Sequence, residues 1–239
     1  MNAESLILDI DRISDPIRAK NSERFFKTGK GEYGEGDKFI GITMPQLRKI
    51  CQKYRSLSLS ELSKLLSSPI HEHRMSAVVI MSDIFKSSNP DKQSAIYNLY
   101  LESVKTNKIN NWDLIDVSAP HVVGEYIFIN KTPEVIIELA KSKLLWEKRT
   151  AVLATSPFLK NGISIYTIKV SEILLKDEHD LIQKAVGWFL REMGKRVSEE
   201  LLLDFLDKHA HEMPRTMLRY SLEKLNPILR QKYMSAKRS

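Results

Sequence analysis

The sequence predicts an all-α fold, an α-α superhelix (solenoid) of HEAT-like helical hairpins. Three observations lead to this prediction: apolar residues recur at helical spacing, helix start and stop signals punctuate the chain, and similar helix beginnings return along it. The composition, 42% apolar and 28% charged over 239 residues, is typical of a folded globular protein. A helical array is therefore expected over most of the chain.

Two helices are expected before residues 28–41, TGKGEYGEGDKFIG, which hold five of the nine glycines. This stretch is expected to be a connecting loop, because it does not lie between a strand and the start of a helix as phosphate-binding glycine motifs do. After it, helices are expected in pairs. The pairs are 44–55 with 58–67, 71–86 with 90–105, 111–129 with 132–142, 145–160 with 163–175, 179–196 with 198–209, and 212–223 with 225–235.

Local signals support these boundaries. Thr43 to Gln46 has the capping-box form with a proline near the first turn, so a helix is expected to begin there. Asn89-Pro90 and Thr132-Pro133 place a capping side chain before a proline, and Asn161-Gly162 is typical of a helix end. Residues 163–170, ISIYTIKV, suit a strand as well as a helix, and a helix is preferred because no partner strand is evident.

Similar helix beginnings recur at His71, Asn110, Trp146, Asp180 and Pro214. A helical hairpin that cannot bury its apolar face alone is stabilised by stacking on its neighbours, which produces a solenoid with one concave face. Equivalent positions of successive repeats line that face. We therefore expect one domain spanning residues 1–239.

The overall charge favours an acidic partner. The formal net charge is +7, which suits nucleic acid or an anionic membrane surface without distinguishing them. Cys51 is the only cysteine, so no internal disulfide can form, in keeping with a reducing compartment. The sequence has no apolar run of membrane-spanning length, and its N-terminus is acidic where a signal peptide would be basic. A cytoplasmic protein is expected.

The segment NNWDLID carries the first candidate site. Trp112 and Asp116 are four residues apart, so on a helix they project from one face as neighbours. Asp113 projects from a different side, and its replacement is expected to leave activity intact. Taken alone, the pair is better explained by a half-buried tryptophan beside a solvated carboxylate than by a functional site.

The segment LIQKAVGWFLREMGKR carries the second. Lys184, Trp188, Arg191 and Lys195 form one stripe of cations around a tryptophan. A nucleic-acid groove uses both kinds of side chain, whereas a solvated helix face seldom places a tryptophan among its cations. Trp146 and Arg149 repeat the pairing on the intervening hairpin, and all three tryptophans are expected to line the concave face.

Four segments together resemble the AlkD-like family of bacterial DNA alkylation repair proteins, over nearly the whole chain. They are Phe25 to Ile50, Asn110 to Ile127, Trp146 to Ala154, and Leu181 to Glu192. The resemblance implies a HEAT-like α-solenoid that removes cationic alkylated purines from duplex DNA. It implies that Asp116 is the catalytic carboxylate, that Trp112 and Trp188 belong to the active site, and that Arg149 contacts DNA phosphate.

The chain departs from the family pattern at two places. Asp180 and Leu181 stand where well-studied members have aromatic residues, and Thr43 stands where some members carry a glutamine that contacts DNA. The DNA-binding set predicted from the stripe and the resemblance together is Arg149, Lys184, Arg191, Lys195, Thr43 and Trp146.

No metal or other cofactor is expected. His71 and His73 are two residues apart and diverge on a helix, and His209 and His211 repeat that spacing. The C-terminal residues 230–239, RQKYMSAKRS, are expected to be a solvated tail rather than a DNA-binding arm.

Three functions follow from these observations. A monofunctional DNA glycosylase accounts for the most residues. A non-catalytic binder of branched or damaged DNA is the main alternative. A solenoid adaptor for protein partners does not call for a cationic stripe around a tryptophan. The expected partner is double-stranded DNA containing alkylated bases, bound by a monomer that needs no obligate protein partner and no membrane.

Overall fold

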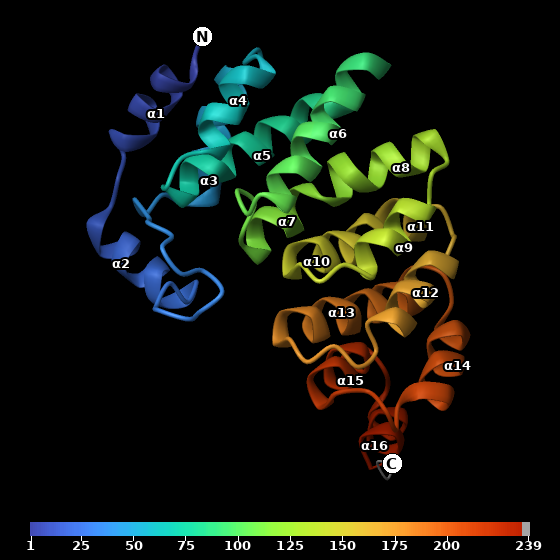
Figure 1. Ribbon diagram of the computed structural model, residues 1–239. Coiled ribbons are helices and arrows are strands. Elements are labelled where there is room, and N and C mark those ends of the chain that lie inside the picture. Colours follow the sequence, from blue (N-terminus) through green and yellow to red (C-terminus); the bar gives the residue numbers. More distant parts are fainter. Residues whose placement is uncertain (236–239) are drawn as a thin grey trace. The chain divides into compact units, whose positions relative to one another are not determined.

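The computed structural model describes residues 1–235 and is all-α within them (Figure 1). The described residues contain no strand, only an isolated parallel bridge between Lys38 and Ile70. The chain divides into two compact units, the first spanning Met1–Tyr126 and the second beginning at Ile127. None of the helices in residues 1–235 has the length and apolar character needed to cross a bilayer.

The first unit is organised around one buried helix, α5 (His71–Phe85). Every side chain from His71 to Met81 is buried, and α5 packs against the helices before and after it. The other helices of this unit are α1 (Ala3–Asp11), α2 (Pro16–Phe25), α3 (Met44–Cys51) with a 3₁₀ turn (Gln52–Tyr54), α4 (Leu59–Leu66), α6 (Pro90–Lys105) and α7 (Trp112–Ser118). A π-helical turn (Pro120–Gly124) leads into α8 (Glu125–Asn130), at which the second unit begins.

The second unit is organised around α13 (Asp180–Arg196), which packs against α10, α11, α12, α14 and α15. The other helices of this unit are α9 (Glu134–Ala140), α10 (Leu145–Ala154), α11 (Ser156–Lys160), α12 (Ile165–Ile173), α14 (Glu199–His209), α15 (Arg215–Ser221) and α16 (Pro227–Ser235). The apolar side of α13, which includes Ile182, Val186, Phe189 and Met193, is buried.

The predicted helices are confirmed, including both helices before the glycine-rich loop. Residues 165–173 are helical, so the strand alternative for 163–170 is wrong. The expected helices 111–129 and 145–160 are both interrupted. In the first, Pro120 has no N–H to donate to the carbonyl of Asp116, and the backbone forms a π turn in which the amide of Gly124 donates to Ala119 O at 2.9 Å.

Residues 230–235 of the expected solvated tail belong to α16, in keeping with the helix predicted over 225–235. Most of their side chains are exposed, but Tyr233 is buried, so this part of the segment is packed against the unit and is not a free tail. The remaining residues of that segment, 236–239, lie outside the described residues. The single array over 1–239 stays a prediction.

Candidate nucleic-acid interface

Trp112 of the first unit rests on an aromatic cluster. Its ring stacks on Phe26, with centroids 5.5 Å apart, and meets Phe25 edge-on at 6.0 Å. Trp112 is half-buried, while Phe25 keeps 65% of its surface exposed. The tryptophan is therefore held from one side by Phe26, which lies between α2 and the glycine-rich loop.

The start of α7 is fixed by two polar contacts. The amide of Trp112 donates to Asn111 Oδ1 at 2.9 Å, which caps the helix. One residue on, Asp113 Oδ2 accepts a hydrogen bond from His71 Nε2 at 2.9 Å. Asp113 thus points toward His71 of α5. Because it is bound to a buried imidazole, it is also a structural partner, and the expectation that its replacement leaves activity intact stays a prediction.

A buried polar network joins the glycine-rich loop, the start of α5 and the residues before α7. Arg74 Nη2 donates to Asp37 Oδ1 at 2.7 Å, and Asn110 Nδ2 donates to the same oxygen at 2.9 Å. His71 Nδ1 faces Asp37 Oδ2 at 3.4 Å. Burial lowers the pKa of His71, but Asp113 and Asp37 together raise it to about 9, so the imidazole is protonated at neutral pH. Sequence reasoning missed this network, whose members are up to 74 positions apart.

The glycine-rich loop is tied down by Glu72 at the start of α5. Its Oε1 accepts hydrogen bonds from the amides of Gly41 at 2.8 Å and Ile42 at 3.4 Å, and its Oε2 accepts from Ile40 at 3.1 Å. The loop amides from 40 to 42 are thus directed at an internal carboxylate. This supports the interpretation of the segment as a connecting loop.

Asp116 lies one turn beyond Trp112 on α7, and both side chains are half-buried. The shared helix face predicted from the spacing is therefore present. Directly after this face, at Pro120, the α-helix changes to the π turn described above. Single π turns inside α-helices are rare, and they are frequently found at functional sites.

Thr43 caps α3, as its capping-box pattern predicted. Its amide donates to Gln46 Oε1 at 3.1 Å, and its hydroxyl donates to the same oxygen at 2.6 Å. The Thr43 hydroxyl thus has a structural partner. Contact with DNA at this position stays a prediction.

In the second unit, the stripe on α13 is present and only partly buried. Trp188 and Arg191 are half-buried and Lys195 is exposed. The stripe also carries acidic partners that the sequence reasoning missed. Lys184 forms an ion pair with Asp180 at 2.6 Å, and Arg191 forms one with Glu223 from the turn after α15. The stripe is therefore less positive than its lysines and arginine alone suggest.

A second carboxylate lies beside Trp188. Glu192, four residues on, accepts a hydrogen bond from Arg196 Nε at 2.8 Å and lies 3.7 Å from Arg191 Nη2. Trp188, Glu192 and Lys195 line a cavity of about 240 Å³. The spacing repeats that of Trp112 and Asp116, and this could have been noticed in the sequence.

Trp146 and Arg149 are more buried than their predicted role implied. Trp146 is 6% exposed and Arg149 is 4% exposed, so little of either side chain is open to a ligand in this structure. Arg149 Nη1 donates to the carbonyl of Leu181 at 2.6 Å, which ties α10 to the first turn of α13. The predicted roles of both residues in binding DNA stay predictions.

Thr43, Trp112 and Asp116 belong to the first unit, and the other six predicted site residues belong to the second. Within residues 1–235, no three His, Cys, Asp or Glu side chains are grouped to hold a metal ion.

Comparisons with known proteins give one family match and one similar fold. The model of a family described as DNA alkylation repair enzyme matches residues 6–225. A structure described as "Predicted DNA alkylation repair enzyme from Enterococcus faecalis" is similar with a TM-score of 0.70 and 15% sequence identity. The similarity covers 90% of this chain and 97% of that one. At that identity the likeness shows the fold. The comparison with curated proteins found no match.

Proposed function

The chain belongs to the DNA alkylation repair enzyme family, and on that premise we propose that it is a DNA glycosylase acting on cationic alkylated purines. The substrates are purines of the 3-methyladenine and 7-methylguanine type in duplex DNA, and the reaction hydrolyses the N-glycosidic bond as the first step of base excision repair. The observation that carries the proposal is the Trp112 and Asp116 pair on one face of α7.

One carboxylate is sufficient for this chemistry. An N3- or N7-alkylated purine already carries positive charge and leaves as a neutral base, so it needs no general acid. As the bond to the base breaks, the sugar becomes oxocarbenium-like, and Asp116 stabilises that charge and orients the water that adds to the sugar.

The tryptophans account for the preference for a charged lesion. The face of an indole attracts a cation by about 0.5–2 kcal/mol, depending on how far the site excludes water. Phe26 supports Trp112 from one side, which fixes the orientation of the ring. A neutral base gains less from the same contact.

The proposal includes the domain organisation and the DNA-binding residues. It keeps one domain of HEAT-like helical hairpins over residues 1–239, to which both the α7 pair and the α13 stripe belong. Duplex DNA would bind through Arg149, Lys184, Arg191, Lys195, Thr43 and Trp146. We further propose a cytoplasmic monomer that needs no cofactor and no obligate protein partner.

The test is single-turnover release of 7-methylguanine from a defined duplex, with binding to undamaged DNA measured separately. Asp116→Asn keeps the shape of the side chain and removes its charge. The excision rate should fall by about 10²- to 10³-fold while DNA affinity stays nearly unchanged. The matched control is Asp91→Asn, since Asp91 is exposed in the first turn of α6.

Full activity in Asp116→Asn would show that this carboxylate has no catalytic role. Release of no base by the parent protein, together with retained DNA binding, would favour the alternative of a non-catalytic binder of branched or damaged DNA.

A further inference from the structure

Two glycines bring α13 unusually close to its neighbours. A Cβ added at Gly187 would lie 2.3 Å from the carbonyl oxygen of Met217 on α15, and one at Gly194 would lie 2.7 Å from Leu202 Cδ2 on α14. The two glycines are two helical turns apart and therefore lie on one face. Arg191 lies between them on that face, so its side chain leaves α13 along the contact with α15.

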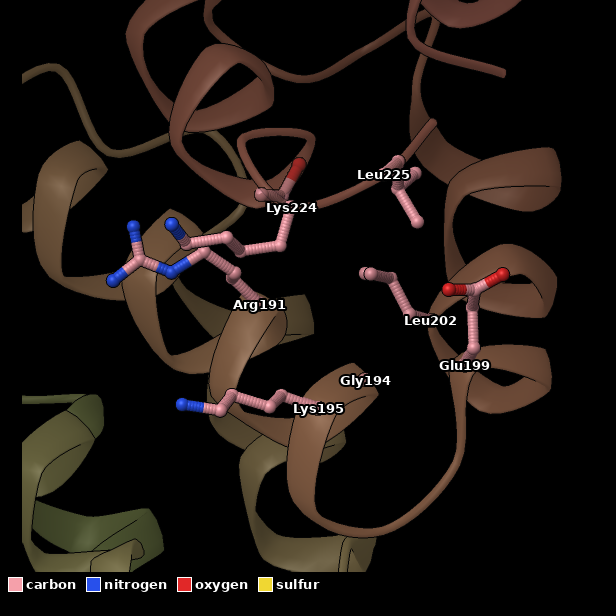
Figure 2. A pocket seen from close by; sticks show the side chains of 8 residues that line it. Arg191, Gly194, Lys195, Glu199, Leu202, Lys224 and Leu225 are labelled. Carbon is pink, nitrogen blue, oxygen red and sulfur yellow. The ribbon is translucent and has the colours of Figure 1, made fainter. Parts of the chain in front are cut away.

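A cavity of about 180 Å³ opens at this place. Arg191 and Lys195 of α13 and Lys224 of the turn after α15 supply its cationic lining, and Leu202 is part of its apolar wall. Figure 2 shows the three cationic side chains extending toward one side of the pocket, while Glu199 lies on the opposite side. The pocket thus has a positively charged side that faces away from its one acidic lining residue.

The guanidinium of Arg191 already holds an anionic group. It is paired with the carboxylate of Glu223, whose side chain is 49% exposed, whereas that of Arg191 is 17% exposed. Glu223 does not line the pocket itself but directly precedes Lys224, which does. A planar guanidinium binds carboxylate and phosphate by the same forked geometry, so a phosphate group can replace this carboxylate.

Lys195 also lines the cavity beside Trp188 described above. A ligand that spans both cavities would therefore place an anionic group in the cavity lined by Arg191 and an aromatic or apolar group in the cavity lined by Trp188. A strand of nucleic acid, with its alternating phosphates and nucleosides, has that composition.

We propose that the pocket formed by Arg191, Lys195 and Lys224 binds one phosphodiester group of the DNA backbone, which displaces Glu223 from Arg191. This rests on the proposed function only in that the protein binds duplex DNA. Lys224 is then a DNA contact, and Glu223 is an internal competitor that weakens binding at this position.

The test measures affinity for an undamaged duplex oligonucleotide at several salt concentrations. Lys224→Gln should lower the slope of log K against log salt by about 1, because one phosphate contact is lost. Glu223→Gln should raise affinity by about fivefold at low salt, because the competing carboxylate loses its charge. The side chains of Lys224 and Glu223 are both exposed, and circular dichroism checks that each variant folds.

The matched controls come from one ion pair of the same unit. Lys176 Nζ lies 3.0 Å from Glu212 Oε2, with Lys176 77% exposed, and neither residue lines the pocket. Lys176→Gln and Glu212→Gln make the same changes in net charge. Both should leave the slope unchanged, and Glu212→Gln should raise affinity less than Glu223→Gln.

If the parent still binds DNA and the slope of log K against log salt is the same for Lys224→Gln and Lys176→Gln, the pocket does not bind a DNA phosphate. The proposal that the protein binds duplex DNA would be unaffected. A parent that binds no duplex would overturn the proposed function and this site with it. A second arm compares sodium phosphate with sodium chloride at equal ionic strength. Equal displacement of the duplex supports a backbone site. Selective displacement by phosphate, lost in Lys224→Gln, would show that the pocket takes free phosphate instead.

Discussion

His71 and Asp113 form an ion pair in which Nε2 lies 2.9 Å from Oδ2, the histidine being 3% and the aspartate 18% exposed. His71 also stacks on Phe39, with centroids 4.6 Å apart, and contacts Phe26, on which Trp112 lies. The pair therefore joins the polar network and the aromatic cluster under the proposed active site.

Replacing Asp113 by Asn is expected to destabilise the protein. The change removes a charged partner from a buried imidazolium, and hydrogen bonds to charged groups contribute about 1.5–3 kcal/mol. The free energy of unfolding from urea titration at pH 7 should fall by that amount. Asp204→Asn, at an exposed position of α14, should change it by less than about 0.5 kcal/mol. Equal stability of the two variants would contradict the structural role of Asp113.

The same pair predicts a dependence of stability on pH. The pKa of His71 is raised above its unfolded value, so its contribution is complete below about pH 6.5 and is lost as pH rises through about 9. Urea midpoints between pH 6 and pH 10 should fall more steeply for the parent than for Asp113→Asn. Parallel curves for the two proteins would show that His71 is not protonated in the folded state.

Arg149→Ala should lower stability as well as DNA affinity. The side chain is 4% exposed and donates to the carbonyl of Leu181, so its loss should cost about 1.5–3 kcal/mol of unfolding free energy. Urea denaturation and duplex binding are measured on the same preparation. Lys169→Ala, on the exposed side of α12, should leave stability nearly unchanged. Weaker DNA binding by Arg149→Ala without any loss of stability would argue against its structural contact.

Alanine at the two glycines of α13 should have different effects. At Gly187 the new methyl group meets backbone, Met217 O at 2.3 Å, so the neighbouring helix must move, at a cost of about 1–3 kcal/mol. At Gly194 it meets only side-chain atoms, Leu202 Cδ2 at 2.7 Å and Leu202 Cβ at 3.1 Å, so a smaller shift relieves the contact. Both variants gain about 1 kcal/mol in helix propensity, which offsets more of the cost at Gly194. Thermal unfolding should give a lower Tm for Gly187→Ala than for Gly194→Ala. The reverse order would contradict the close contact between α13 and α15.

The helices were predictable because their signals are local. Thr43 to Gln46 marks the beginning of α3, and Asn89 caps α6, through side chains within three residues of the amides they bind. The shared face of Trp112 and Asp116 follows from helix geometry alone.

The surroundings of the site were not predictable from one sequence. Asp37 and Arg74 pair across 37 positions, and Arg191 and Glu223 pair across 32, so no periodicity connects them. The burial of Arg149 likewise depends on how α10 packs against α13. These contacts decide which of the predicted cations are exposed, and only the folded chain shows them.

The position of Arg191 between Gly187 and Gly194 has a consequence for how this protein can change over evolution. The residue that would tune affinity for an anionic ligand lies on the face that sets the packing of α13 on α14 and α15. A substitution selected there for tighter or looser binding also alters the fit between helices. We therefore expect adaptive changes in affinity to arise first at Lys195, Glu223 and Lys224, where the side chains are more exposed and stability limits variation least.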